Sequence, residues 1–208
     1  MSRRRTTAAL LAVLLALLTA CTSDPGGTGG PVDAPFAVDV DVDTPRLRTL
    51  KKEAGVEPCP EGGTTVRASE GMPEISLACL GGGPDVDLSS LTGPLVVNLW
   101  AQWCGPCRDE LPYYQRLHEE AGGKVQVLGI DYQDTQPEVA LELIGETSVT
   151  YPLLADPAGQ IRVPFKVRGL PGVIFVDGDG SITHIEYVVI DSYEQLRDLV
   201  SQHLGVTL

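Results

Sequence analysis

Residues 98–107 read NLWAQWCGPC, an apolar segment followed by two cysteines with two residues between them. The apolar run Leu95–Trp100 is typical of a short buried strand. A helical pattern of apolar residues then runs from Cys104 to Ala121. The cysteine pair is therefore predicted at a junction between a strand and a helix.

That position favours thiol chemistry. The first turn of a helix offers free backbone N–H groups and the positive end of the helix dipole, which stabilise a thiolate. Cys104 occupies this turn, and Cys107 follows one turn later on the same face. Gly105 and Pro106 between them allow a tight approach. We predict a redox pair in which Cys104 attacks and Cys107 resolves the mixed disulfide.

Two other interpretations of the CxxC motif are weaker. A zinc site usually needs four ligands. The histidines, however, are scattered at His118, His184 and His203, and the cysteines Cys59 and Cys79 do not form a second CxxC motif. A purely structural disulfide would close too short a ring to remove much entropy from the unfolded chain.

Cys59 and Cys79 are predicted to form a structural disulfide that ties the N-terminal helical region to the following strand. Their loop of about twenty residues would contribute roughly 3 kcal/mol through the chain entropy of the unfolded state. The alternative is a second redox pair that passes electrons to Cys104 and Cys107. Neither cysteine of this second pair has a helix N-terminus beside it in the sequence.

The first twenty residues are typical of an export signal. A positive start, Arg3–Arg5, precedes the apolar segment Ala8–Leu18, which is too short to cross a bilayer comfortably. Small residues then precede Cys21, which resembles the lipidated cysteine of bacterial lipoproteins. We expect an extracytoplasmic protein that is lipid-anchored at Cys21, a compartment in which disulfides persist. A plain secretory signal is the alternative.

Composition supports one globular α/β domain. The chain has 208 residues, of which 43% are hydrophobic. Its formal charge of −13 argues against nucleic acid as a partner. The predicted organisation is a signal peptide at 1–20, a flexible Gly/Pro-rich tether at 21–43, an N-terminal extension at 44–71 and the main domain at 72–208.

The main domain has the predicted order β-α-β-α-β-β-α, which implies a mixed sheet with parallel central strands. Thr135 and Asp191 are predicted to cap two of its helices, and Pro112 is expected to kink the helix that follows Cys104. Strands are predicted at 74–80, 95–100, 124–130, 172–176 and 182–188, with a short extended piece at 151–154. Helices are predicted at 104–121 and 135–146 and after 191.

With this order of elements, the WCGPC motif resembles the thioredoxin superfamily. Over about residues 72–204, the chain is most similar to its membrane-anchored TlpA/ResA-like thiol–disulfide oxidoreductases (redoxin domain). Gly169–Gly172 (GLPG), just before a strand, matches the family's cis-proline loop. The resemblance implies a thioredoxin-like fold, no cofactor and no metal, with Pro171 shielding the cysteines from metal. It also implies that the backbone of Leu170 pairs with an extended substrate segment, and that Trp103, Gly105 and Pro106 border the substrate.

Two positions depart from thioredoxin itself. Asn98, which cannot titrate, replaces the buried aspartate of the strand before the motif. The ResA-like branch has instead a glutamate three residues after the second cysteine, which is matched here by Glu110. Glu110 would take the proton from Cys107 as that thiol attacks. The alternative is a solvated helix glutamate.

The expected function is disulfide exchange with exported protein thiols and disulfides. Reduction is favoured, for example in cytochrome c maturation, with electrons from a membrane thiol-reductase. Oxidation of newly exported chains is the alternative. A copper metallochaperone is disfavoured because related carriers use CxxxC with a distal histidine, and this chain offers CxxC with His184. A thiol peroxidase needs a threonine shortly before the cysteine, where this chain has Gln102 and Trp103.

Overall fold

A seven-stranded mixed sheet forms the centre of the computed structural model, which describes residues 39–61 and 70–208. The strands lie in the order β2-β1-β5-β4-β3-β6-β7 across the sheet. Their bounds are β1 (Ser76–Cys79), β2 (Val86–Asp87), β3 (Leu95–Trp100), β4 (Gln126–Tyr132), β5 (Leu153–Asp156), β6 (Gly172–Val176) and β7 (Ile182–Glu186).

The strand before the cysteines is central. β3 pairs in parallel with β4 and antiparallel with β6. All six of its residues are buried, which explains why it reads as a continuous apolar run without alternation. Because β3 is held by hydrogen bonds on both edges, the position at which it ends is fixed. The residues that follow it are therefore presented from a rigid edge of the sheet.

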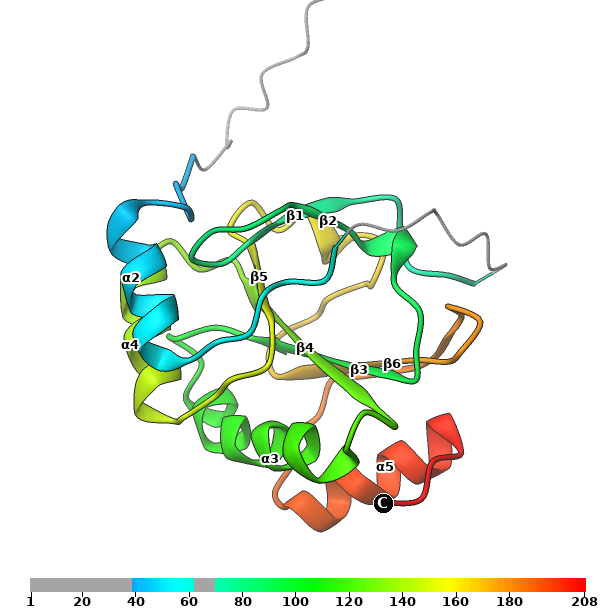
Figure 1. The fold of residues 1–208 in the computed structure, drawn as a ribbon. Helices are drawn as coiled ribbons and strands as arrows, with labels where there is room; N and C mark the ends of the chain where they lie inside the picture. Colours follow the sequence, from blue (N-terminus) through cyan, green and yellow to red (C-terminus); the bar gives the residue numbers. More distant parts are fainter. Residues whose placement is uncertain (1–38, 62–69) are drawn as a thin grey trace, which may run out of the picture. The chain divides into compact units, whose positions relative to one another are not determined.

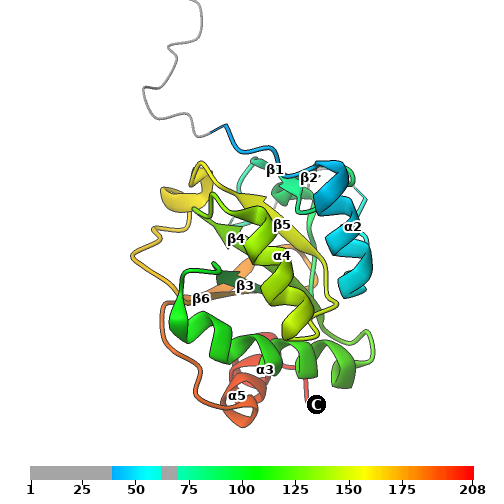
Figure 2. The ribbon, with the colours of Figure 1, turned by 90° about the vertical axis from the view of Figure 1, so that its left-hand side faces the viewer.

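Four helices cover the sheet: α2 (Pro45–Ala54), α3 (Gly105–Ala121), α4 (Pro137–Glu146) and α5 (Tyr193–Leu204). Helices α3 and α5 lie side by side, and so do α2 and α4 (Figures 1 and 2). Buried residues of all four belong to one core cluster, which includes Leu47, Leu111, Leu141 and Leu196. A second cluster, on strands β1 to β6 and the loops beside them, contains Cys59, Cys79, Ile161 and Phe165. From β3 onward the order is β3-α3-β4-α4-β5-β6-β7-α5. The predicted β-α-β-α-β-β-α order is confirmed except for one added strand, β5, which forms where an extended piece was predicted at 151–154.

Two predicted helix caps are wrong. Helix α4 has Gln136 at its N-cap with no side-chain cap bond, and Asp134, not Thr135, accepts the N–H of Gln136 at 2.8 Å. Helix α5 is capped by Ser192, whose Oγ accepts the N–H of Gln195 at 3.2 Å, and not by Asp191. In both places a neighbouring oxygen acceptor is better placed by the preceding loop.

Other boundaries shift only slightly. Helix α3 begins at Gly105 with Cys104 as its N-cap, and it continues through Pro112 to Ala121. The short strand β2 was not predicted from the sequence. In α2, Thr44 is the N-cap, with its side chain accepting the N–H of Leu47 at 3.2 Å.

The predicted signal peptide, Cys21 and most of the predicted tether lie outside the described residues. Within the described part of the chain, no helix is both long enough and apolar enough to span a membrane.

Candidate redox site

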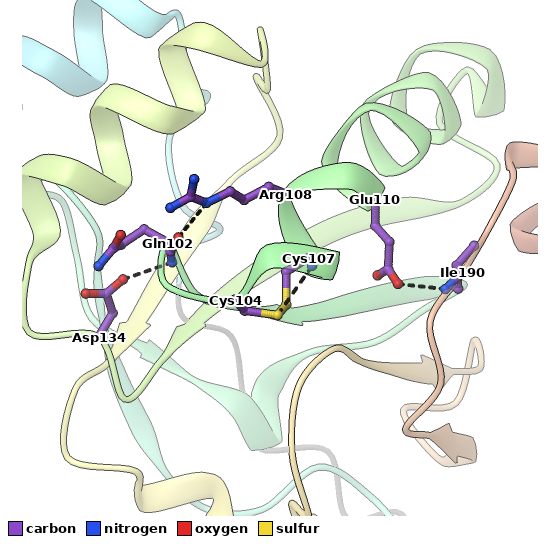
Figure 3. Close-up of a disulfide and its surroundings, with 7 residues drawn as sticks. All are labelled: Gln102, Cys104, Cys107, Arg108, Glu110, Asp134 and Ile190. Carbon is purple, nitrogen blue, oxygen red and sulfur yellow. Dashed lines mark hydrogen bonds between the residues drawn. A yellow bond between two sulfur atoms is a disulfide. The ribbon is translucent and has the colours of Figure 1, made fainter.

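Cys104 and Cys107 form a disulfide at the N-terminus of α3, with Cα atoms 5.3 Å apart. Cys104 is the N-cap residue, and its Sγ accepts the backbone N–H of Cys107 at 3.3 Å (Figure 3). An unpaired donor of the first helical turn therefore points at the sulfur of Cys104. The same contact would stabilise a thiolate on this sulfur after reduction.

The surroundings of the pair are unequal. Cys104 is 5% exposed and Cys107 only 1%. Trp103 beside them is 53% exposed, and its indole N–H donates to the backbone oxygen of Gln133 at 3.2 Å. Gly105 and Pro106 are exposed too, and a Cβ at Gly105 would meet no atom within 4 Å. The pair thus lies beside an open surface, and Cys104 is the slightly more exposed of the two buried cysteines.

The loop between β3 and α3 is held by polar contacts that were missed from the sequence. The backbone N–H of Gln102 donates to Asp134 Oδ2 at 3.0 Å. The backbone oxygen of Gln102 accepts from Arg108 Nε at 2.7 Å. Figure 3 shows Gln102 between these two partners. Asp134 and Arg108 therefore fix the residues just before Cys104 from both sides.

A second carboxyl lies near Asp134. Asp131, at the level of Trp100 in the sheet register, is buried, and its Oδ1 has no partner among the described residues. Burial, together with the negative charge of Asp134, raises the pKa of Asp131 well above its usual value. Asp131 therefore binds its proton more tightly than an exposed aspartate does. The only sequence signal for it was its place at the end of an apolar strand.

Glu110 is buried, so the solvated alternative is wrong. Its side chain is 1% exposed, and Oε1 accepts the N–H of Ile190 at 2.6 Å (Figure 3). Its Oε2 has no partner among the described residues. Burial raises the pKa of Glu110 to about 7, partly opposed by the Ile190 hydrogen bond. The carboxyl is thus half ionised near neutral pH, one helical turn beyond Cys107 on α3.

The structure shows the role of Asn98, which stands where thioredoxin itself has a buried aspartate. Asn98 is buried in β3, and its Nδ2 donates to the hydroxyl of Tyr151 at 3.2 Å. It therefore serves as a polar contact inside the core, and Glu110 is the titratable group on the α3 side.

The Leu170–Pro171 peptide bond is cis, as predicted. Pro171 is buried and Leu170 half-buried, and both line a groove of about 750 Å³ with Phe165, Arg168, Tyr187 and Val189. Of the four predicted substrate contacts, only Leu170 lines this groove, whereas Trp103, Gly105 and Pro106 form the exposed surface around the cysteines.

Gly172 directly follows the cis-proline. A Cβ on Gly172 would lie 2.8 Å from the ring of Tyr187, so the tyrosine fills the space that a side chain would need. The hydroxyl of Tyr187 in turn donates to the backbone oxygen of Phe165 at 2.8 Å. This packing ties β7 to the loop before the cis-proline.

The histidines are not all scattered in space. The rings of His184 in β7 and His203 in α5 stack with centroids 4.0 Å apart, and a Glu186 oxygen lies within 4.8 Å of both. His118 instead contacts Glu57, with 3.1 Å between Nε2 and Oε1. The histidine pair belongs to β7 and α5, whereas the CxxC cysteines belong to the β3–α3 junction.

The predicted disulfide between Cys59 and Cys79 is present, with Cα atoms 6.0 Å apart and twenty residues of sequence separation. Both cysteines are buried. Cys79 ends β1, which pairs with β5, so the bridge joins the segment after α2 to the sheet.

Residues 69–185 match the AhpC/TSA family model. The chain belongs to the AhpC/TSA family. Among its relatives, the thiol-disulfide oxidoreductase ResA of Oceanobacillus iheyensis is 31% identical over 124 residues, covering 57% of this chain and 64% of ResA. The thiol:disulfide interchange protein DsbE of Allochromatium vinosum is 33% identical over 114 residues, covering 53% of this chain and 61% of DsbE. The chain thus spans less than two thirds of the length of each of these two relatives.

The fold comparison agrees. The solved structure of DsbF from Mycobacterium tuberculosis superimposes with a TM-score of 0.56 and 27% sequence identity, covering 62% of this chain and 94% of DsbF. The structure of this AhpC/TSA family member is therefore thioredoxin-like, as the resemblance implied.

Replacing Glu110 with glutamine tests whether this carboxyl titrates in the site. The amide oxygen can still accept the Ile190 N–H, but it cannot take a proton. In the wild type, thiol exchange is expected to rise as pH passes through about 7, because Glu110 ionises there. In Glu110→Gln, exchange at pH 8 should fall by about 100-fold and this pH step should vanish.

Stability gives a second readout. The folded-state pKa of Glu110 lies above its ordinary value, so the folded state binds this proton more tightly than the unfolded state. Wild-type stability should therefore fall as pH rises from 4.5 through about 7, and Glu110→Gln should lose that component in urea unfolding at pH 5 and 8. Glu119→Gln, on the exposed side of α3, is the control. An unchanged pH profile in Glu110→Gln would exclude the role.

Proposed function

We propose that the protein is an extracytoplasmic thiol–disulfide oxidoreductase that exchanges disulfides with exported proteins. The observation that carries this proposal is the Cys104–Cys107 disulfide at the start of α3. There Cys104 is the N-cap residue, and its Sγ accepts the N–H of Cys107. The names of the relatives and the neighbouring cis-Pro171 loop support it.

In the reducing direction, the Cys104 thiolate attacks one sulfur of a substrate disulfide. A mixed disulfide forms, and the other substrate sulfur leaves as a thiolate. The thiol of Cys107 then loses its proton, with Glu110 as the acceptor, and attacks Cys104 Sγ. The second substrate sulfur leaves, and two electrons have passed from the protein dithiol to the substrate.

The substrate approaches over the exposed surface of Trp103, Gly105 and Pro106. An extended segment next to its cysteine lies in the groove beside Pro171, where the backbone of Leu170 pairs with it. Arg108 and Asp134 hold the loop before Cys104 in place through Gln102, so the attacking sulfur needs little reorganisation.

Trapping tests the assignment of the two sulfurs. A Cys107→Ser variant should accumulate a mixed disulfide between Cys104 and exported protein thiols, because nothing resolves it. Cys104→Ser should form none, since the remaining cysteine, Cys107, is the more buried of the two and lacks the N-cap position. Non-reducing gels followed by mass spectrometry provide the readout. Equal trapping by both variants would contradict the roles assigned to the two cysteines.

We propose that the protein reduces its substrates, for example during cytochrome c maturation. A membrane thiol-reductase would supply the electrons. The Gly-Pro dipeptide between the cysteines, shared with reducing thioredoxins, supports this direction of transfer. We expect a reduction potential for Cys104–Cys107 near −270 mV, as in thioredoxin, when the protein is equilibrated with thiol–disulfide buffers. A potential towards −120 mV would instead indicate an oxidant of exported thiols.

We further propose that residues 1–20 are removed and that Cys21 becomes a lipidated N-terminus, with residues 21–43 as the tether. The RRR start, the apolar segment and the position of Cys21 support this. In bacteria fed a labelled fatty acid, the wild type should incorporate label and fractionate with membranes. Cys21→Ser should do neither, whereas Cys59→Ser serves as a thiol control. Label retained in Cys21→Ser would refute the anchor.

A further inference from the structure

Lys51 in α2 lies against the second disulfide. Its side chain is buried, at 8% exposure, and its Nζ donates to Cys79 Sγ at 2.9 Å. The same Nζ donates to the backbone oxygen of Gly82 at 2.8 Å. Both acceptors are neutral while Cys79 is bonded to Cys59. The ammonium group therefore points at a sulfur that carries no charge in the oxidised protein.

A buried ammonium group without an anionic partner is costly. Among the described residues, no carboxylate oxygen lies within 4.0 Å of Lys51 Nζ. The nearby acid, Asp43, accepts instead from Nε and Nη2 of Arg48, at 2.6 and 2.9 Å. Burial accordingly lowers the pKa of Lys51, and the charge of Asp43 only partly offsets this. What the site lacks is an anion beside Nζ.

Reduction of the disulfide would supply that anion. We propose that Cys59–Cys79 is a second reducible disulfide, in which Lys51 stabilises Cys79 as the leaving thiolate and an external thiol attacks Cys59. A cation beside a sulfur favours its thiolate form, and a more stable thiolate leaves faster. The activating group comes from α2, a separate element, which is why the sequence around either cysteine gave no sign of it.

The surface offers an approach to Cys59. A cavity of about 290 Å³ is lined by Cys59, Gly83 and three basic side chains, those of Arg48, Lys51 and Lys52. These three positive side chains would attract an incoming thiolate, although the chain as a whole has a formal charge of −13. Cys79 does not line this cavity, so the geometry assigns attack to Cys59 and departure to Cys79.

The exchange balances with a simple thiol as the reductant. An external thiolate attacks Cys59 Sγ, the Cys59–Cys79 bond breaks, and its electron pair leaves on Cys79 beside the ammonium group of Lys51. A second thiolate then attacks the external sulfur of the mixed disulfide. This attack breaks the bond to Cys59 and releases the Cys59 thiolate, which takes a proton from solvent. The two external sulfurs leave bonded to each other as a disulfide. Two electrons have entered the protein.

This site is separate from the Cys104–Cys107 pair. Cys79 ends β1 and Cys104 follows β3, and both β5 and β4 lie between these strands in the sheet. We therefore assign the second disulfide to external thiols rather than to electron relay within the chain. The inference does not depend on the function proposed for Cys104 and Cys107.

The test follows both disulfides in the same molecules. The native full-length protein is incubated with reduced glutathione, and free cysteines are alkylated over time and located by mass spectrometry. Lys51→Met should slow the opening of Cys59–Cys79 by about tenfold or more, the effect of removing a charge that stabilises a thiolate. The opening of Cys104–Cys107 in the same sample should be unchanged. Lys124→Met, at an exposed lysine that does not line this cavity, should leave both rates unchanged.

The outcome separates a redox role from a structural one. If Lys51 only supported packing, Lys51→Met would loosen the fold and open Cys59–Cys79 as fast as the wild type or faster, which would overturn the proposal. Should Lys51→Met fail to fold, the proposal is tested on the wild type by comparing two rates. Opening of Cys59–Cys79 must then outpace global unfolding, measured in urea with both disulfides intact. Opening no faster than unfolding would equally overturn it.

Discussion

The site depends on one contact, in which the sulfur of Cys104 takes the place of an N-cap oxygen and accepts the N–H of Cys107. This contact needs two supports. β3 must end at a fixed point, which its pairing with β4 and β6 ensures. Helix α3 must begin immediately afterwards, which the contacts of Gln102 with Asp134 and Arg108 ensure. The sheet, the loop and the helix dipole thus act together on one sulfur.

Two buried acids lie on the elements beside this contact, Glu110 on α3 and Asp131 on β4. Glu110 and Asp131 are both held in the interior with an oxygen that has no partner in the described part of the chain, and burial raises the pKa of both. Their environments differ. Glu110 keeps a strong backbone donor in Ile190, and its pKa is raised to about 7. Burial and the neighbouring charge of Asp134 raise the pKa of Asp131 well above its usual value. Glu110 is therefore the acid whose pKa suits proton transfer near neutral pH.

The two disulfides illustrate two ways of placing a positive potential beside a sulfur. At Cys104 it comes from the backbone at a helix N-terminus, and the local sequence shows it. At Cys79 it comes from the Lys51 side chain, which reaches the sulfur across 28 residues of sequence. The first arrangement is visible in the spacing of a motif, and the second exists only because α2 packs beside the end of β1.

The sequence by itself determined the strand–helix junction, the CxxC chemistry, the thioredoxin-like order of elements and the Cys59–Cys79 pairing. These follow from local patterns, namely apolar runs, cysteine spacing and turn residues. It placed the N-caps of α4 and α5 one residue too early, at Thr135 and Asp191, because the loop before each helix decides where the helix begins, at Gln136 and Ser192. Only the tertiary structure decided that Glu110 is buried, that Asp134 holds the loop before Cys104, that His184 meets His203, and that Lys51 reaches Cys79. Burial and long-range contact depend on how whole elements pack, and no local pattern of residues carries that information.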